Sequence, residues 1–421
     1  MEGDVPVFTR AMRHTHTILL PGMAIIQFSL LANVLKDEGY NVKLLQNEGP
    51  QVVQKGLRYV HNDTCYPALL VIGQMIDALD SGTYDLDHVA LAITQTGGGC
   101  RASNYIHLLR KALVRAGYCH IPVLSLNLKG LDRHSGFQIT LRMLRKGLAA
   151  IVCGDALKLL SNQVSPYEKN HGETQALVQT WITRLSSQFR KGRGHTRSAM
   201  RRNLHAMVAE FAAIDTDYSR PVVKVGIVGE IYMKYAPLGN NHLEDFLAQE
   251  CCEVMVPGIM GFVLYGVYNQ MQDIKLYGGS ALKVRLVQWL LGYLISLEKI
   301  SIEAIRSEKS EKRLTPQVSF RETIESAQEV IGLGCKMGEG WLLTGEMRDL
   351  AKMGYTNIIC VQPFGCLPNH IVGKGMIRKL KELDAQSNIV PIDYDPSATR
   401  VNQENRIKLM LAVAAENRDV L

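Results

Sequence analysis

The sequence predicts an α/β protein built from two domains, each with a parallel sheet. Short buried strands alternate with segments whose apolar residues recur at helical spacing, and the turns between them are short. A strand, a helix and a second strand joined in this way favour a parallel sheet. The pattern occurs twice, so we expect a first α/β domain at residues 1–137, a helical connecting region at 138–220, and a second α/β domain at 221–421.

Each half contains four strand-like segments. In the first half the predicted strands are 17–23, 40–45, 88–94 and 122–126, and the predicted helices are 26–38, 68–79 and 106–116. In the second half the predicted strands are 222–228, 253–257, 358–366 and 389–393, and the predicted helices are 242–250, 282–305, 371–383 and 401–415. Long helical patterns, including 177–189, fill the middle region.

Composition restricts the class of protein. With 421 residues, 47% of them hydrophobic, the chain is large enough to bury sizeable cores without disulfides. A net charge of +7 is mild for this length and does not argue for nucleic-acid binding. The most apolar helix-like run, 286–297, is too short to span a bilayer. Nine cysteines and no signal-like N-terminus favour a reducing cytoplasm, where paired thiols indicate metal binding or catalysis.

The stretch 357–370 organises the rest of the prediction. It places Cys360 and Cys366 at a strand-to-helix turn, together with Pro363 and Pro368, which stiffen the loop. Such turns lie at the carboxyl edge of a parallel sheet, where ligands bind. Cys360 continues a buried strand and is expected to pack inside, whereas Cys366 lies beyond the strand and is free to face a cleft. A metal site and simple packing of both thiols are the two interpretations.

Three predicted turns expose a cysteine: those at Cys65, Cys100 and Cys366. Cys is a soft ligand that suits zinc or iron–sulfur centres. Zinc sites of the common kinds require closely spaced Cys pairs, which are missing here. Widely separated thiolates suit a cluster held between two domains that face each other.

Glycines 97–99 precede Cys100 and allow a close backbone approach. A phosphate cradle is one interpretation, but neither a P-loop nor a dinucleotide fingerprint occurs, so no ATP site is expected. The alternative is that their N–H groups approach the Cys100 sulfur or a cluster sulfide. Such donors raise a reduction potential.

Several other residues have two interpretations. Glu230, the 240–242 turn and the 393–396 turn either cap helices and turns or face the same cleft. The basic stretch 188–203 is either a solvated helix face or a docking surface for an acidic partner or polyanionic ligand. Five further cysteines are interpreted as core or incidental: Cys119, Cys153, Cys251, Cys252 and Cys335.

Several motifs together resemble the 2-hydroxyacyl-CoA dehydratase superfamily. The similarity is greatest to a branch related to its D-component, often fused to or encoded beside the ATP-dependent activase. The main motifs are NDTCYPA at 62–68, TGGGCRASNY at 96–105, GEGW at 338–341 and QPFGCLPNH at 362–370. Further matches are SPYE at 165–168, GEIY at 229–232, DYDP at 393–396 and NQENR at 402–406.

The resemblance implies Rossmann-like, flavodoxin-like domains with helical insertions and a cluster in the interdomain cleft. It implies that Cys65, Cys100 and Cys366 hold a [4Fe-4S] cluster with one iron open, with Cys360 as the runner-up ligand. A double-cubane [8Fe-9S] cluster is the alternative cofactor. The implied partners are an activase that hydrolyses ATP and delivers low-potential electrons, a second identical or related subunit, and a CoA thioester substrate.

The expected function is reductive or radical chemistry, such as dehydration of a 2-hydroxyacyl-CoA. The alternatives are a double-cubane reductase of a small non-CoA substrate and a non-catalytic electron carrier or cluster scaffold. A zinc-binding structural protein is a further alternative. No catalytic acid or base is identified from the sequence.

Overall fold

The computed structural model describes residues 5–61, 63–94, 99–126, 135–308 and 314–419. Two four-stranded sheets, each entirely parallel, occupy the two halves of the chain. The first has the order β2-β1-β3-β4, from β1 (Thr17–Leu20), β2 (Asn41–Leu44), β3 (Val89–Thr94) and β4 (Val123–Leu126). The second has the order β6-β5-β7-β8, from β5 (Val223–Gly229), β6 (Cys252–Met255), β7 (Asn357–Pro363) and β8 (Asn388–Tyr394). The predicted α/β class with two Rossmann-like domains is confirmed.

The central strands are buried on both faces, as the apolar runs in the sequence indicate. In the second sheet Val361 of β7 pairs with Gly229 of β5 and Ile392 of β8. Because neighbouring strands run in the same direction, their carboxyl ends lie at one edge. Loops that follow these strands are therefore brought together.

The first half adds helices on the faces of its sheet: α1 (Met12–Thr15), α2 (Ile25–Asp37), α3 (Pro50–Tyr59), α4 (Tyr66–Asp80), η1 (Leu86–His88), η2 (Arg101–Asn104) and α5 (Tyr105–Ala116). The sequence reasoning missed α3. This helix packs closely on α4, where Gly56 and Gly73 allow the two backbones to approach.

The connecting region forms α6 (Leu141–Val164), η3 (Ser165–Tyr167), α7 (Glu173–Arg190) and α8 (Arg197–Ala213). It packs with α2 on one side and with α13 (Ala281–Arg306) on the other. One hydrophobic core joins all these helices, including Leu30, Leu157, Trp181, Met207 and Leu297. The connecting region is thus part of a helical layer to which both α/β halves contribute.

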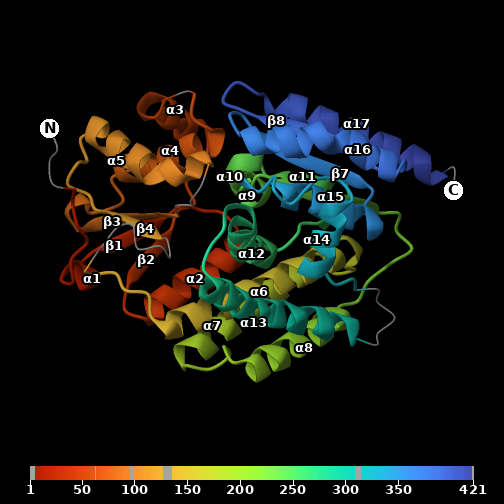
Figure 1. Ribbon diagram of the computed structural model, residues 1–421, viewed down its shortest axis with the longest axis horizontal. Helices are drawn as coiled ribbons and strands as arrows, with labels where there is room; N and C mark the ends of the chain where they lie inside the picture. The colour runs from red at the N-terminus through yellow and green to blue at the C-terminus, as the bar shows by residue number, and fades with distance from the viewer. Residues whose placement is uncertain (1–4, 62, 95–98, 127–134, 309–313, 420–421) are drawn as a thin grey trace.

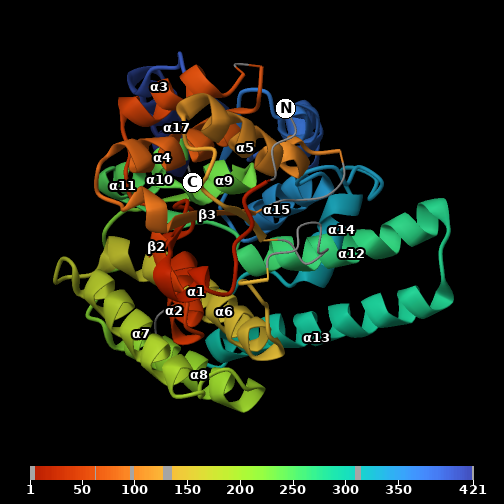
Figure 2. The same cartoon turned by 90° about the vertical axis from the view of Figure 1, so that its left-hand side faces the viewer.

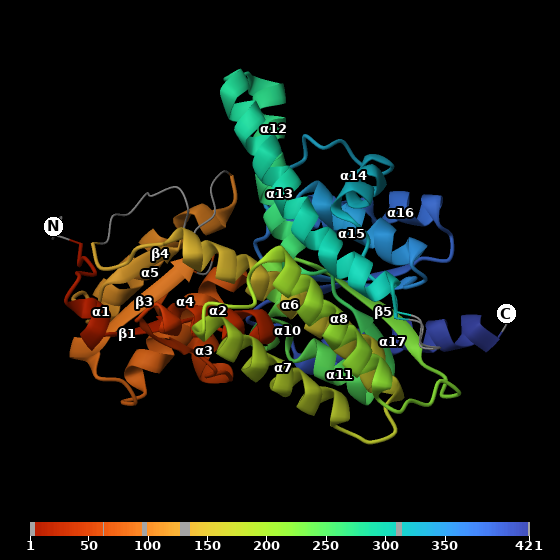
Figure 3. The ribbon, with the colours of Figure 1, turned by 90° about the horizontal axis from the view of Figure 1, so that it is seen from below.

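Helix α12 (Ile259–Tyr277) and helix α13 form a hairpin that projects from this layer (Figures 2 and 3). Its outer part exposes large apolar side chains, namely Tyr277, Leu282, Leu286 and Trp289. Among the described residues, no helix is both long enough and apolar enough to cross a bilayer.

The remaining helices of the second half are α9 (Ile231–Tyr235), α10 (Pro237–Asn240), α11 (Leu243–Gln249), α14 (Phe320–Gln328), α15 (Trp341–Lys352), α16 (Ile377–Leu383) and α17 (Arg400–Asp419). The helix predicted at 371–383 was wrong in its first part. A π-helical turn, η4 (Asn369–Gly373), and a 3₁₀ turn, η5 (Lys374–Met376), precede α16. The sequence reasoning also missed α12, α14 and α15.

The two α/β halves share a second hydrophobic core. Tyr66 and Met75 of α4 pack in it together with Tyr232 and Ala236 beside α9. Helix α4, from the first half, contacts α10, which directly follows α9 in the second (Figure 1). The carboxyl-edge loops of both sheets consequently meet at the junction of the halves.

We predict that Gly73→Ala destabilises the fold. A Cβ at Gly73 would lie 2.2 Å from the Val52 carbonyl oxygen and 2.8 Å from the Gly56 nitrogen, both backbone atoms that cannot move cheaply. The expected loss is about 1–3 kcal/mol of unfolding free energy, measured by urea titration. The control is Gly266→Ala in α12, where a Cβ meets open space. It should gain up to about 1 kcal/mol from helix propensity. Equal effects of the two substitutions would contradict the close packing.

Candidate metal centre between the two halves

Cys65 occupies the N-cap position of α4, immediately after the 61–64 turn. Its carbonyl oxygen accepts the first helical hydrogen bonds, from Ala68 and Leu69. Its sulfur lies 3.0 Å from the hydroxyl oxygen of Tyr105, at the start of α5. The thiol is thus held between two helices at the carboxyl edge of the first sheet.

Cys100 is the N-cap residue of η2, a few residues beyond β3. The predicted approach of glycine N–H groups falls mostly on residues 95–98, which lie outside the described residues. Gly99 is described, and its N–H contacts the Met337 sulfur at 3.4 Å. This contact brings the Cys100 loop against a loop of the second half.

Cys366 follows β7, and its loop touches the Cys65 loop directly. The main-chain N–H of Tyr66 donates to the Phe364 carbonyl oxygen at 2.9 Å. Gly365 has φ 73°, and a Cβ there would lie 3.1 Å from the Cys65 Cα. A side chain at position 365 would therefore separate the two loops. The Cys366 sulfur accepts a hydrogen bond from the Asn369 amide at 3.2 Å.

Cys360 lies elsewhere. It is fully buried within β7, in the hydrophobic core that also contains Trp341 and Ile358. Its sulfur accepts a hydrogen bond from the Gln362 amide at 3.6 Å. The prediction that strand packing buries Cys360 is confirmed, and its role as a runner-up ligand stays a prediction.

Two carboxyl groups, those of Glu230 and Glu339, act electrostatically on the thiols. Glu230 is the N-cap of α9 and accepts the Met233 N–H at 2.9 Å. Glu339 accepts the Ile231 N–H at 3.0 Å and the Asn369 amide at 3.3 Å. Asn369 therefore bridges Glu339 to the Cys366 sulfur. Glu230 does cap a helix, as one interpretation held, and it also acts electrostatically on the thiols.

Burial raises the pKa of all three thiols. For Cys100 burial raises the pKa to about 11, and Glu339 is the carboxylate that adds most to this increase. For Cys366 burial also raises the pKa, followed by the charges of Glu339 and Glu230. Burial and then mutual repulsion likewise raise the pKa of Glu230. Such a site disfavours negative charge and would be stabilised by a bound cation.

The donor set suits a cluster better than a single ion. Within the ranges described, no three His, Cys, Asp or Glu side chains are close enough to hold one metal ion. In a cluster each cysteine binds a different iron, so its ligands stand further apart than those of one ion. Three soft thiols on loops that meet at the junction, with two carboxylates, are compatible with such a group.

Sequence reasoning set aside Cys335, which lies near this site. It is exposed, and its carbonyl oxygen accepts the Trp341 N–H at 2.7 Å. Burial raises the pKa of Tyr265, and the charges of Glu339, Cys335 and Cys100 add to the increase. Of the other four cysteines, Cys153 and Cys252 are buried, and Cys119 and Cys251 are exposed.

Three residues beside the thiols had no role in the sequence interpretation: Tyr105, Glu339 and Asn369. Their only signal was membership of the motifs around the predicted cysteines. A polar residue inside a turn is usually a cap or a turn former, so spacing alone does not distinguish it. The contacts with sulfur require the three-dimensional arrangement.

Parts of the 240–242 and 393–396 turns, namely Asn241, His242 and residues 394–396, line a cavity of about 540 Å³ between the halves. Asn241 and His242 both have left-handed backbones, with φ of 56° and 58°. The His242 ring bonds Glu48 of the first half at 2.9 Å and Asp245 at 3.0 Å. Asn240 is buried and its side-chain oxygen accepts the Leu243 N–H. Asn241 and His242 therefore line a cavity that none of the three cysteines lines, although Tyr66, next to Cys65, does.

The basic stretch 188–203 joins α7 and α8, which lie away from α4 and α9 in Figures 1 and 2. Several of its arginines have partners within the chain. Arg190 pairs with Asp37, Arg201 with Glu303, and the Arg197 guanidinium stacks over Tyr293. These contacts favour the solvated-face interpretation, although docking itself is not tested by them.

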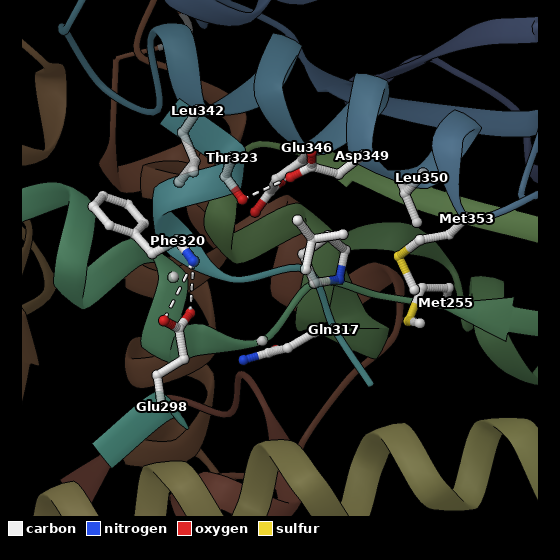
Figure 4. A pocket seen from close by; sticks show the side chains of 14 residues that line it. Met255, Glu298, Gln317, Phe320, Thr323, Leu342, Glu346, Asp349, Leu350 and Met353 are labelled. Carbon is white, nitrogen blue, oxygen red and sulfur yellow. Dashed lines mark hydrogen bonds between the residues drawn. The ribbon is translucent and has the colours of Figure 1, made fainter. Parts of the chain in front are cut away.

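A small cavity behind α15 is lined by three carboxylic side chains (Figure 4). Glu298 accepts the Phe320 N–H at 3.1 Å, and Asp349 accepts the Thr323 hydroxyl at 2.6 Å. Glu346 pairs with the buried Lys234 at 3.0 Å. Burial raises the pKa of Glu298 to about 7 and that of Asp349 to about 6.

Comparison with known proteins adds no identification. No protein-family model matches the chain, and no curated protein matches it. The interpretation of the thiol site therefore depends on its geometry and on the motifs named above.

We predict a pH-dependent gain of stability in Glu298→Gln. An ordinary Glu has a pKa near 4.3, whereas burial raises the pKa of Glu298 in the folded protein to about 7. Between these two pH values, Glu298 is protonated in the folded protein and ionised in the unfolded chain. The stability that this group contributes is full below its unfolded pKa and is lost as the pH rises through the folded pKa. Glutamine keeps an oxygen for the Phe320 N–H but does not titrate.

The advantage of Glu298→Gln over the wild type should therefore grow by about 1–3 kcal/mol between about pH 5 and pH 8. Urea unfolding at several pH values measures it. The control is Glu329→Gln, because hydrogen bonds from Lys352 and Arg348 lower the pKa of Glu329 and move its titration below this range. Parallel pH profiles for wild type and Glu298→Gln would contradict the prediction.

Proposed function

We propose that this chain is an iron–sulfur protein of the 2-hydroxyacyl-CoA dehydratase type. The observation that carries the proposal is the meeting of the Cys65, Cys100 and Cys366 loops at one junction. These loops come from both halves, and each contains a motif whose cysteine was predicted to be a ligand. Burial raises the pKa of all three thiols, so a bound cation would stabilise their thiolate forms.

Each thiol has a distinct support. Cys65 is oriented by Tyr105 and Cys366 by Asn369, through contacts of 3.0 and 3.2 Å to their sulfurs. Hydrogen bonds to sulfur raise a reduction potential, whereas the nearby charges of Glu230 and Glu339 lower it. When bound, a [4Fe-4S] cluster supplies a low-potential electron and an iron that polarises a substrate oxygen.

The proposed electron donor is an ATP-dependent activase with its own cluster, and the proposed substrate is a CoA thioester such as a 2-hydroxyacyl-CoA. A cytoplasmic location and a second, identical or related subunit belong to the same proposal. Exposed apolar side chains around the thiol loops support docking of a protein there, namely Met337, Phe364, Leu367 and Ile371.

A double-cubane [8Fe-9S] reductase is a second candidate function. A larger cluster needs more protein ligands, and Cys335 is a further thiol beside Tyr265 at this site. Iron and sulfide stoichiometry of the anaerobically purified protein distinguishes the two clusters. Turnover with activase, ATP and a 2-hydroxyacyl-CoA supports the dehydratase, and reduction without turnover of any substrate supports an electron carrier.

We predict that Cys65→Ser, Cys100→Ser and Cys366→Ser each lose the cluster, whereas Cys360→Ser keeps it. The first three remove thiols at the junction, and the fourth removes a thiol packed in the β7 core. Iron content and the visible spectrum under anaerobic conditions measure the outcome. Cys119→Ser, at an exposed position, is the control. Loss in Cys360→Ser alone would overturn this ligand assignment.

We also predict that Arg101→Glu slows electron delivery from the activase. Arg101 is exposed directly beside Cys100, so its reversal changes the charge that a donor meets. The effect should be larger at low salt, because ions screen exposed charges over about 10 Å at 0.1 M. Arg202→Glu, exposed on α8, is the control and should leave the rate unchanged. Equal slowing by both variants would indicate that the basic stretch 188–203 also takes part in docking.

A further inference from the structure

The two halves repeat one arrangement of strands and loops. Their sheets have corresponding orders, β2-β1-β3-β4 and β6-β5-β7-β8. In the first half Cys65 immediately precedes α4, the chain continues into the inner strand β3, and Cys100 follows that strand. The junction therefore has two positions in each half that can be compared between the halves. One precedes the helix that leads into the inner strand, and the other follows that strand.

The second half places Glu339 and Cys366 at these positions. Glu339 lies just before α15, which leads into β7, and Cys366 follows β7. Strand β7 occupies the same position in its sheet as β3 does in the first. Cys366 is thus the counterpart of Cys100. Glu339 lies one residue before Gly340, the N-cap of α15, and is the polar side chain nearest in the chain to the position that Cys65 occupies as the N-cap of α4. Glu230 follows β5, the counterpart of β1, and corresponds to neither cysteine.

The surroundings of Glu339 support the correspondence. Its side chain is 7% exposed, and its carboxylate is connected to the Cys366 sulfur through the Asn369 amide. Among the carboxylates it has the largest electrostatic effect on both Cys100 and Cys366. The strand thiol Cys360 accepts a hydrogen bond from the Gln362 amide, which also donates to the Asn369 carbonyl oxygen. Its sulfur nevertheless lies in the hydrophobic core.

We infer that Glu339 supplies the fourth protein donor of the cluster, opposite the three thiolates. This inference rests on the proposed function and names the ligand of the iron that the thiols leave open. A carboxylate oxygen has two lone pairs, so Glu339 can keep its bonds from Ile231 and Asn369 and still offer a lone pair. Carboxylate is a harder ligand than thiolate, so this position binds iron more weakly and exchanges more readily.

The test compares three variants after anaerobic cluster loading: Glu339→Gln, Glu339→Cys and Glu230→Gln. Limited oxidation with ferricyanide removes the most weakly held iron, and electron paramagnetic resonance follows the three-iron product. We expect Glu339→Gln to lose this iron about ten- to a hundredfold faster than the wild type and Glu339→Cys to lose it correspondingly more slowly. Glu230→Gln removes a neighbouring carboxylate from a position with no cysteine counterpart and should behave as the wild type.

The outcomes separate this inference from the proposed function. A wild-type protein that binds no iron overturns both. Iron-loaded wild type with unchanged release in Glu339→Gln and Glu339→Cys overturns the inference alone, as does equal acceleration in Glu339→Gln and Glu230→Gln. Circular dichroism of the cluster-free variants checks folding. A folded Glu339→Gln protein that retains no iron supports the inference, provided that Glu230→Gln retains it.

Discussion

The contact between the Cys65 and Cys366 loops is the constraint on which the rest of the junction depends. A single main-chain hydrogen bond, from Tyr66 to Phe364, joins the start of α4 to the end of β7. Gly365 makes this approach possible, because a Cβ there would press on Cys65. The two cysteine loops can therefore meet only when both sheets are in place, and their contact is a product of tertiary packing rather than of any local segment.

Beside this junction, buried carboxyl groups outnumber the buried ammonium group that interacts with them. Lys234 is the buried cation that acts on four carboxylates, and it lowers the pKa of each: Asp155, Glu230, Glu339 and Glu346. One ammonium cannot balance four charges in a medium of low polarity. Burial therefore raises the pKa of each of these carboxyl groups, and only Glu346 is paired directly with Lys234 among the four. Burial dominates their pKa values despite that lysine.

The sequence predicted the eight strands and their parallel order because buried strands are short apolar runs between clear turns. It predicted the burial of Cys360 because strand geometry alone decides it. It did not predict α3, α12, α14 or α15. In α3 and α15 the apolar pattern is interrupted by the closely packed Gly56 and Gly345. The involvement of Glu339 was out of reach, because its position is meaningful only after β7 has been matched to β3.

The repeated strand order also has a meaning for the history of this chain. A molecule assembled from two identical halves would place the same two side chains on each side of a twofold axis, giving four equal donors. Here one of those four places holds a carboxylate. Fusion of the halves into one polypeptide allows each copy to change by itself, which two separate identical subunits cannot do. If the proposed cluster binds at this junction, the difference between Glu339 and the three cysteines would make one of its corners chemically distinct.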